Sequence, residues 1–237
     1  MAFTTPAYAG GMPSFVLRVW LADRPGALGA VASRIGAVGG DVVGIDILER
    51  GEGRVIDELT VDLPGEERIP LMLAKLGELD AVDVEDIRPI VAGLPHPLVD
   101  PLETAADLLT ERSVGGLFAA LVAGAQATFA AEWAAVIDAD GPVILHASEA
   151  APPAPWLEAF IAGTRSAGSE RSSGVPVSDV AWASLEVSGL TLLVGRSGRP
   201  FRARERRQLA TIARVADHRW RELVTLDGMR AHPARSP

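Results

Sequence analysis

The stretch Trp20–Val42, WLADRPGALGAVASRIGAVGGDV, joins an apolar run to a helical pattern through a tight turn. The run Phe15–Leu21 carries apolar residues on both faces, which is typical of a central strand in a sheet. After the turn Asp23–Gly26, apolar residues recur at steps of three and four, and this spacing predicts a helix that ends at Gly39-Gly40. A strand-turn-helix of this kind presents backbone N–H groups at a helix N-terminus, which suits an anion or a carboxylate.

The segments that follow this turn extend the pattern to a complete small domain. In one of them, Leu59, Val61 and Leu63 alternate with polar residues, as expected of a half-buried strand. The sequence predicts a strand at Asp41–Glu49, a turn at Arg50–Gly53, a strand at Val55–Leu63, a helix at Ile69–Leu79 and a strand at Val82–Ile90. The order is therefore β-α-β-β-α-β, a ferredoxin-like arrangement of the α+β class.

A second α+β module is predicted after residues 91–100, which carry two prolines and a glycine and are interpreted as a linker. Its elements are a helix from Asp100 that breaks near Gly115-Gly116 and resumes to Gln126, strands at Thr128–Asp138 and Pro142–Ala147, a helix at Trp156–Ala162, a loop at Thr164–Pro176, hairpin strands at Asp179–Val187 and Leu190–Gly195, and a helix at Phe201–Leu226. The predicted divisions of the chain are a flexible arm (1–13), a first domain (14–92), a linker with a helix start (93–113), a second domain (114–227) and a flexible tail (228–237).

Composition narrows the class of protein. The 237 residues carry a formal net charge of −9, which argues against nucleic acid or an anionic membrane as the main partner. The chain has no cysteine, so disulfides and thiolate catalysis are excluded, and a reducing cytoplasm is the expected location. We expect no signal peptide and no membrane-spanning segment from the sequence.

Residues 14–91 resemble an ACT domain, a small module that binds amino acids and regulates metabolism. The resemblance rests on the order of elements together with three short motifs. These motifs are Asp23-Arg24-Pro25-Gly26-Ala27-Leu28 after the first strand, Gly39-Gly40-Asp41 after the first helix, and Val42-Val43-Gly44-Ile45 in the second strand.

The resemblance implies a ligand site at the turn Asp23–Gly26. Asp23 would bind the ammonium of an amino acid, and Arg24 and Pro25 would belong to the same ligand-binding turn. The N–H groups of Gly26, Ala27 and Leu28 would bind the carboxylate of the ligand. Val42, Val43, Gly44 and Ile45 would face the site from the second strand. A second copy of the module would complete the pocket, which implies a homodimer; a small aliphatic amino acid is the preferred ligand, and no cofactor is implied.

Two other interpretations of the turn bear on function. Asp23 can act as a helix cap while Pro25-Gly26 only shapes the chain, in which case the protein is a dimerisation or scaffold protein with an empty site. A dinucleotide site is excluded because the glycine spacing after Pro25 is not G-x-G-x-x-G. The short turn Arg50–Gly53 also joins two strands directly, whereas a parallel dinucleotide-binding sheet needs a helical crossover there.

Residues 114–226 resemble a degenerate GAF domain, a sensor module with an antiparallel sheet and flanking helices. The match is carried by Leu190–Phe201 and by Arg204–Leu209 at the start of the last helix. No ligand is carried over, and this domain is expected to pass a response to an unidentified protein partner. The arginines at 202, 204, 206 and 207 are interpreted as a solvated helix face rather than as a site for an acidic partner.

No catalytic constellation is recognisable in the sequence. His96, His146, His218 and His232 are scattered, without the spacing of metal ligands. Asp138 and Asp140 flank a predicted turn, where carboxylates commonly serve the backbone. The sequence therefore predicts a non-catalytic regulatory protein; an enzyme that uses carboxylates of the second domain is the least favoured alternative.

Overall fold

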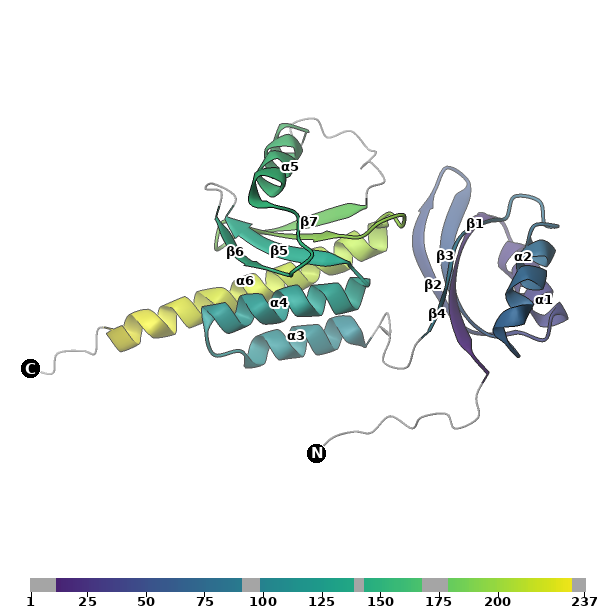
Figure 1. Ribbon diagram of the computed structural model, residues 1–237, viewed down its shortest axis with the longest axis horizontal. Coiled ribbons are helices and arrows are strands. Elements are labelled where there is room, and N and C mark those ends of the chain that lie inside the picture. The colour runs from purple at the N-terminus through teal and green to yellow at the C-terminus, as the bar shows by residue number, and fades with distance from the viewer. Residues whose placement is uncertain (1–11, 91–98, 139–142, 168–178, 232–237) are drawn as a thin grey trace, which may run out of the picture. The chain divides into compact units, whose positions relative to one another are not determined.

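The computed structural model describes residues 12–90, 99–138, 143–167 and 179–231 of the chain, which divides into two compact units, Met1–Leu94 and Pro95–Pro237 (Figure 1). Most of the predicted arm (1–13) and of the predicted linker (91–100) lies outside the described residues. The predicted tail (228–237) begins inside a helix, because the last helix continues to Ala231. No proline interrupts that helix before Pro233, so its backbone hydrogen bonds continue past the predicted end.

The first unit has the predicted β-α-β-β-α-β order. Its elements are β1 (Ser14–Ala22), α1 (Ala27–Ala37), β2 (Asp41–Gly51), β3 (Arg54–Asp62), the short 3₁₀ helix η1 (Glu66–Arg68), α2 (Ile69–Leu76) and β4 (Asp83–Pro89). The four strands form an antiparallel sheet in the order β2-β3-β1-β4. Helices α1 and α2 lie side by side against one face of this sheet (Figure 1). Strand β2 is therefore an edge of the sheet, and β1 and β3 lie at its centre.

Alternation in the two central strands builds the core under the helices. Leu17 lies opposite Leu59 in the antiparallel register of β1 and β3, and both are fully buried. Val31 and Ile35 project from α1 into the same apolar cluster. The residues that alternate inward from the strands and those that recur every three or four positions in the helix thus form one apolar layer.

The second unit is an antiparallel sheet with helices on both faces. Its elements are α3 (Asp100–Thr110), α4 (Val114–Phe129), β5 (Trp133–Asp138), β6 (Ile144–Ala147), α5 (Ala154–Ala167), β7 (Val180–Leu185), β8 (Leu190–Gly195) and α6 (Ala203–Ala231). The strand order is β6-β5-β8-β7. The main core lies between one face of the sheet and α3, α4 and α6. A smaller core lies between the opposite face and α5 (Figure 1).

Helix α3 belongs to the second unit rather than to a linker over residues 93–113. Leu108 of α3 is fully buried in the core that α4 and α6 share. The hydroxyls of Thr104 and Thr128 lie 3.0 Å apart across the contact between α3 and α4. Gly124 permits this close approach, because a Cβ atom built on it would lie 2.5 Å from Cγ2 of Thr104. The apolar face of α3 therefore finds its partner in the second core.

Several boundaries in the second unit differ from the predicted ones. The break after the first helix lies before Val114, where the Ser113 hydroxyl accepts the N–H of Gly116 at 3.1 Å and begins α4. Helix α4 then continues to Phe129, and Ala130 ends it in the left-handed region (φ 45°), so the predicted strand from Thr128 begins only at Trp133. Helix α5 is longer than predicted and includes the first residues of the predicted loop Thr164–Pro176; residues 168–176 of that loop lie outside the described residues.

Candidate functional site

The β1–α1 turn adopts a conformation that depends on glycine. Gly26 precedes α1 with φ 86° and ψ −12°, in the left-handed region that side-chain-bearing residues adopt only with strain. A Cβ atom built on Gly26 would meet no atom within 4 Å, so steric space is not the constraint. The backbone angle alone therefore explains why glycine stands at this position.

Hydrogen bonds of the backbone fix the course of this turn. The N–H of Arg24 donates to the carbonyl of Ala22 (2.8 Å), and that of Asp23 donates to the carbonyl of Gly53 (2.8 Å) in the β2–β3 hairpin. Of the three amides expected to bind a carboxylate, that of Ala27 donates to the carbonyl of Arg24 (3.3 Å). The turn is thus anchored both within itself and to the neighbouring hairpin.

The N-terminus of α1 is not capped by a side chain. Gly26 occupies the cap position, and within the described part of the chain no side-chain cap accepts a hydrogen bond from the first turn. The structure therefore contradicts the interpretation of Asp23 as a helix cap. Asp23, Arg24 and Pro25 are exposed. The first helical bond runs from the N–H of Ala30 to the carbonyl of Gly26 (3.0 Å), so the amide of Leu28 precedes the helical ladder and is placed as an anion site requires.

The four residues of β2 that were predicted to face the site differ in burial and do not all lie on the same face of the sheet. Val42 packs against the core of the first unit, whereas Val43 and Ile45 are 55% and 51% exposed. Ile45 lies opposite Leu59, which marks the helix-covered side of the sheet. Gly44 lies opposite Thr60, and a Cβ atom built on it would come within 3.1 Å of the Thr60 hydroxyl, so Gly44 points to the other face. A register shift between Val42 and Gly44 produces this division.

Asp57 is a candidate site residue that the sequence analysis did not single out. It lies in β3 between Val55 and Leu59, at a position where the alternation of this strand places buried apolar residues. Asp57 is only 4% exposed, and its Oδ1 atom has no hydrogen-bond partner among the described residues. Burial raises the pKa of the Asp57 carboxyl above its ordinary value; the charge of Arg50 opposes this shift and the charge of Asp23 adds to it.

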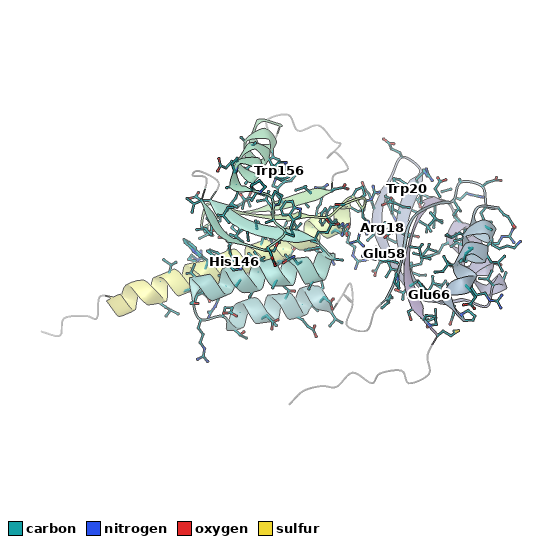
Figure 2. All side chains as sticks on the ribbon, viewed as in Figure 1. Arg18, Trp20, Glu58, Glu66, His146 and Trp156 are labelled. Carbon is teal, nitrogen blue, oxygen red and sulfur yellow. The ribbon has the colours of Figure 1, made fainter. Side chains whose placement is uncertain are left out.

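The opposite face of the first sheet carries a polar network. Arg18, 1% exposed, donates from Nε and Nη2 to Oε2 of Glu58, at 3.2 and 2.8 Å. The indole N–H of Trp20 donates to Oε2 of Glu85 (2.8 Å), and the guanidinium of Arg54 lies 5.0 Å from the centre of the Trp20 ring. Arg18, Trp20 and Glu58 are labelled on this sheet in Figure 2. These residues neutralise one another, so the network is explained as support of the sheet.

The second unit holds a buried arginine beside the start of α6. The guanidinium of Arg196 donates to the carbonyl of Phe129 (2.6 Å) at the end of α4 and to Oε1 of Glu205 (2.7 Å). Glu205 also accepts the backbone N–H of Arg202 (2.8 Å). The predicted solvated arginine face is therefore wrong at position 202, because Arg202 is buried next to this pair; Arg207 is exposed as predicted.

The remaining candidate residues of the second unit are not brought together. His146 lies on the edge strand β6, and His218 lies on α6 with Nδ1 3.1 Å from Nη2 of Arg221. His96, His232 and Asp140 lie outside the described residues. Asp138 ends β5. Among the residues that the structure describes, no group of three histidines or carboxylates could hold a metal ion, and no helix has the length and apolar character that crossing a bilayer requires.

An aromatic cluster lies on the α5 side of the second sheet. Trp156 stacks on Phe160 with ring centres 5.4 Å apart and contacts Trp133 edge-on at 5.9 Å. Phe160 in turn meets Trp182 edge-on at 5.7 Å. Trp156 is labelled in Figure 2 at the base of α5. These rings lie beside the smaller core, in which Leu157 and Ile161 of α5 are the buried contacts with the sheet.

Comparison with known proteins finds a protein-family model that matches most of the first unit. Residues 15–81 match the model of the ACT domain. The solution structure of the ACT domain from a GTP pyrophosphokinase of Chlorobium tepidum is 14% identical and covers 35% of this chain and 90% of that chain, with a TM-score of 0.27. A crystal structure of an unknown protein from Galdieria sulphuraria is also 14% identical and covers 89% and 92% of the two chains, with a TM-score of 0.31. These scores are too low to carry an argument, and the comparison with curated proteins gives no match.

Proposed function

We propose that this protein is a regulatory sensor whose ACT domain binds a small amino acid at the β1–α1 turn. The observation that carries the proposal is the combination of an exposed Asp23, a glycine at φ 86° and a helix N-terminus without a side-chain cap. An ammonium and a carboxylate are the two groups that this combination is suited to bind. The match of residues 15–81 to the ACT domain supports a regulatory role with a small ligand.

We propose further that the ligand acts within a homodimer formed through strand β2. This edge strand exposes three large apolar side chains, those of Val43, Ile45 and Ile47, the last at 42%. An edge with unpaired backbone groups and an exposed apolar stripe is a favourable surface for a second copy. The dimer would bring the β2 strand of one protomer near the β1–α1 turn of its partner, so that ligand and dimerisation stabilise each other.

The second unit would then carry the response to a protein partner. Its antiparallel sheet with helices on both faces supports a GAF-like module as the proposal for this unit. In this scheme the chain has no catalytic step. Ligand binding would change the affinity for the partner through linkage, and the partner would change the affinity for the ligand by the same factor.

A scaffold protein with an empty turn is the second candidate function. The exposed stripe on β2 favours it, because a dimer can form through that stripe without a ligand. The two candidates differ in one property: only the sensor gains stability from an amino acid.

Thermal unfolding of the full chain against each of the twenty amino acids distinguishes the candidates. A ligand at about 100 times its dissociation constant should stabilise the native state by about 2.7 kcal/mol. We expect one amino acid to stabilise the wild type but neither Asp23→Ala nor Gly26→Val. Gly29→Ala is the matched control, because it lies one turn further along α1 in open space and should keep the response. If no amino acid shifts the transition of the wild type, the scaffold function is favoured.

A further inference from the structure

Asp57 interrupts an apolar series that β3 otherwise directs toward the helices. Val55, Leu59 and Val61 share its side of the strand and lie in the core of the first unit. In the sheet, Asp57 lies opposite Val19 on one side and Ile47 on the other. A carboxyl in such surroundings is costly unless it is paired, so its presence requires an explanation.

No group of the described protein satisfies the Oδ1 atom of Asp57. The side chain does not cap α1, since no side chain accepts a hydrogen bond from that helix N-terminus. The charged groups that act on the Asp57 carboxyl are Arg50, an exposed residue near the end of β2, and Asp23, in the β1–α1 turn. In the sheet, Asp57 lies between Val19 of β1, the strand that leads into the turn, and Ile47 of β2, the strand of the proposed dimer edge.

Asp57 is more deeply buried than the residues of the turn. Asp23 is exposed and lies with the N-terminus of α1 at the surface, where the ammonium and carboxylate common to all amino acids would bind. Asp57 is buried on β3, opposite Val19, three residues before Ala22, where β1 ends and the turn begins. The side chain of a ligand held at the turn, the only part that differs among amino acids, would have to reach this position.

We propose, resting on the function proposed above, that Asp57 is a specificity-determining residue that accepts a hydrogen bond from the side chain of the bound amino acid. The ligand class is then an amino acid whose side chain carries a donor, a hydroxyl or an ammonium. This replaces the aliphatic preference expected from the sequence, since an alkyl side chain would leave the buried acceptor unsatisfied. Sites built to accept such a bond reject analogues that lack the donor.

Calorimetric titration of the full chain with matched ligand pairs tests this role. Threonine and valine differ by a hydroxyl in place of a methyl group, and lysine and norleucine differ by a terminal ammonium in place of a methyl group. We expect the wild type to bind the donor-bearing member of one pair about tenfold to a hundredfold more tightly. The pair that shows the preference identifies the donor. Asp57→Val should abolish that preference, and Asp57→Asn should reduce it.

Two further variants show whether a change in ligand preference is specific to the Asp57 carboxyl. Asp86→Asn changes a carboxylate on the opposite edge strand β4 and should leave the preference unchanged. Asp57→Asn retains the shape of the side chain and provides the test should the valine variant not fold. If the wild type binds an amino acid without a donor preference, or if Asp57→Val keeps the preference, the role of Asp57 is wrong while the sensor function stands. If the wild type binds no amino acid at all, the sensor function fails as well.

Discussion

The backbone N–H of Asp23 donates to the carbonyl of Gly53 at 2.8 Å, so the β1–α1 turn is joined to the β2–β3 hairpin. The proposed ligand groups of the turn and the proposed dimer strand β2 are therefore mechanically connected within one protomer. Under the proposed function, a ligand that orders the turn would also act on the end of β2. This connection would then link amino-acid binding to dimerisation.

The conformation of Gly26 predicts a defined cost of substitution. Gly26→Ala places a side chain at φ 86° and should destabilise the first unit by about 1–2 kcal/mol through backbone strain alone. Gly29→Ala, in the first turn of α1 where a Cβ atom would meet no other atom, should instead stabilise it by up to about 1 kcal/mol. Chemical denaturation of both variants measures the difference. Equal stability of the two variants would show that the left-handed turn is not required.

The raised pKa of Asp57 predicts how stability depends on pH. Its folded-state pKa lies above the ordinary value of 3.8, so the folded state loses stability as pH rises from about that value through the folded-state pKa. Asp57→Asn has no such charge, so it should gain stability relative to the wild type as the pH rises from about 3 to 7. The advantage should disappear below pH 4. Parallel stability profiles of the two proteins from pH 3 to 7 would contradict this account.

The buried pair of Arg196 and Glu205 predicts a large effect in the second unit. Glu205→Gln removes the negative charge that lies 2.7 Å from Nη2 of Arg196 and so breaks this buried ion pair. Breaking a buried pair from one side typically costs about 3–5 kcal/mol. Glu78→Gln removes an exposed partner of Lys75 and should leave the stability nearly unchanged. Calorimetric unfolding of both variants checks the contrast, and similar transition temperatures would refute it.

The exposed stripe of β2 predicts the oligomeric state. Ile45→Lys places a charge at the centre of the proposed dimer surface and should convert the dimer to a monomer. Leu71→Lys is the matched control, because Leu71 is similarly exposed, at 45%, but lies on α2. Sedimentation velocity at micromolar concentration measures both variants. A monomeric wild type, or a dimer that survives Ile45→Lys, would contradict the use of β2.

The order of elements in the first unit was predictable because each element has a strong local signal. Leu59 and Val61 alternate with polar residues, and glycines at 26, 39 and 40 mark both ends of α1. In the second unit the boundaries were less predictable. Helix α4 and strand β5 follow each other in one apolar segment, and the end of the helix at Ala130 depends on a left-handed residue that is not glycine.

The buried charges show why part of the candidate site was missed. Asp57 shares the side of Leu59 and Val61 in β3, and this parity is the signal that could have identified it. For Arg202, a run of arginines in the sequence indicates a solvated surface, while the fold places the first of them in the interior. Burial of a charged side chain depends on partners distant in sequence, which a local pattern does not reveal.

An amide ¹H–¹⁵N spectrum of the full chain, recorded with and without an equimolar mixture of the twenty amino acids, tests the amino-acid site at the β1–α1 turn directly. We expect the largest shifts at the amides of Gly26, Ala27 and Leu28, with smaller shifts at Gly53 through its bond to Asp23. The spectrum of Gly26→Val should not respond. A spectrum that stays unchanged, or shifts confined to the second unit, would contradict an amino-acid site at the β1–α1 turn.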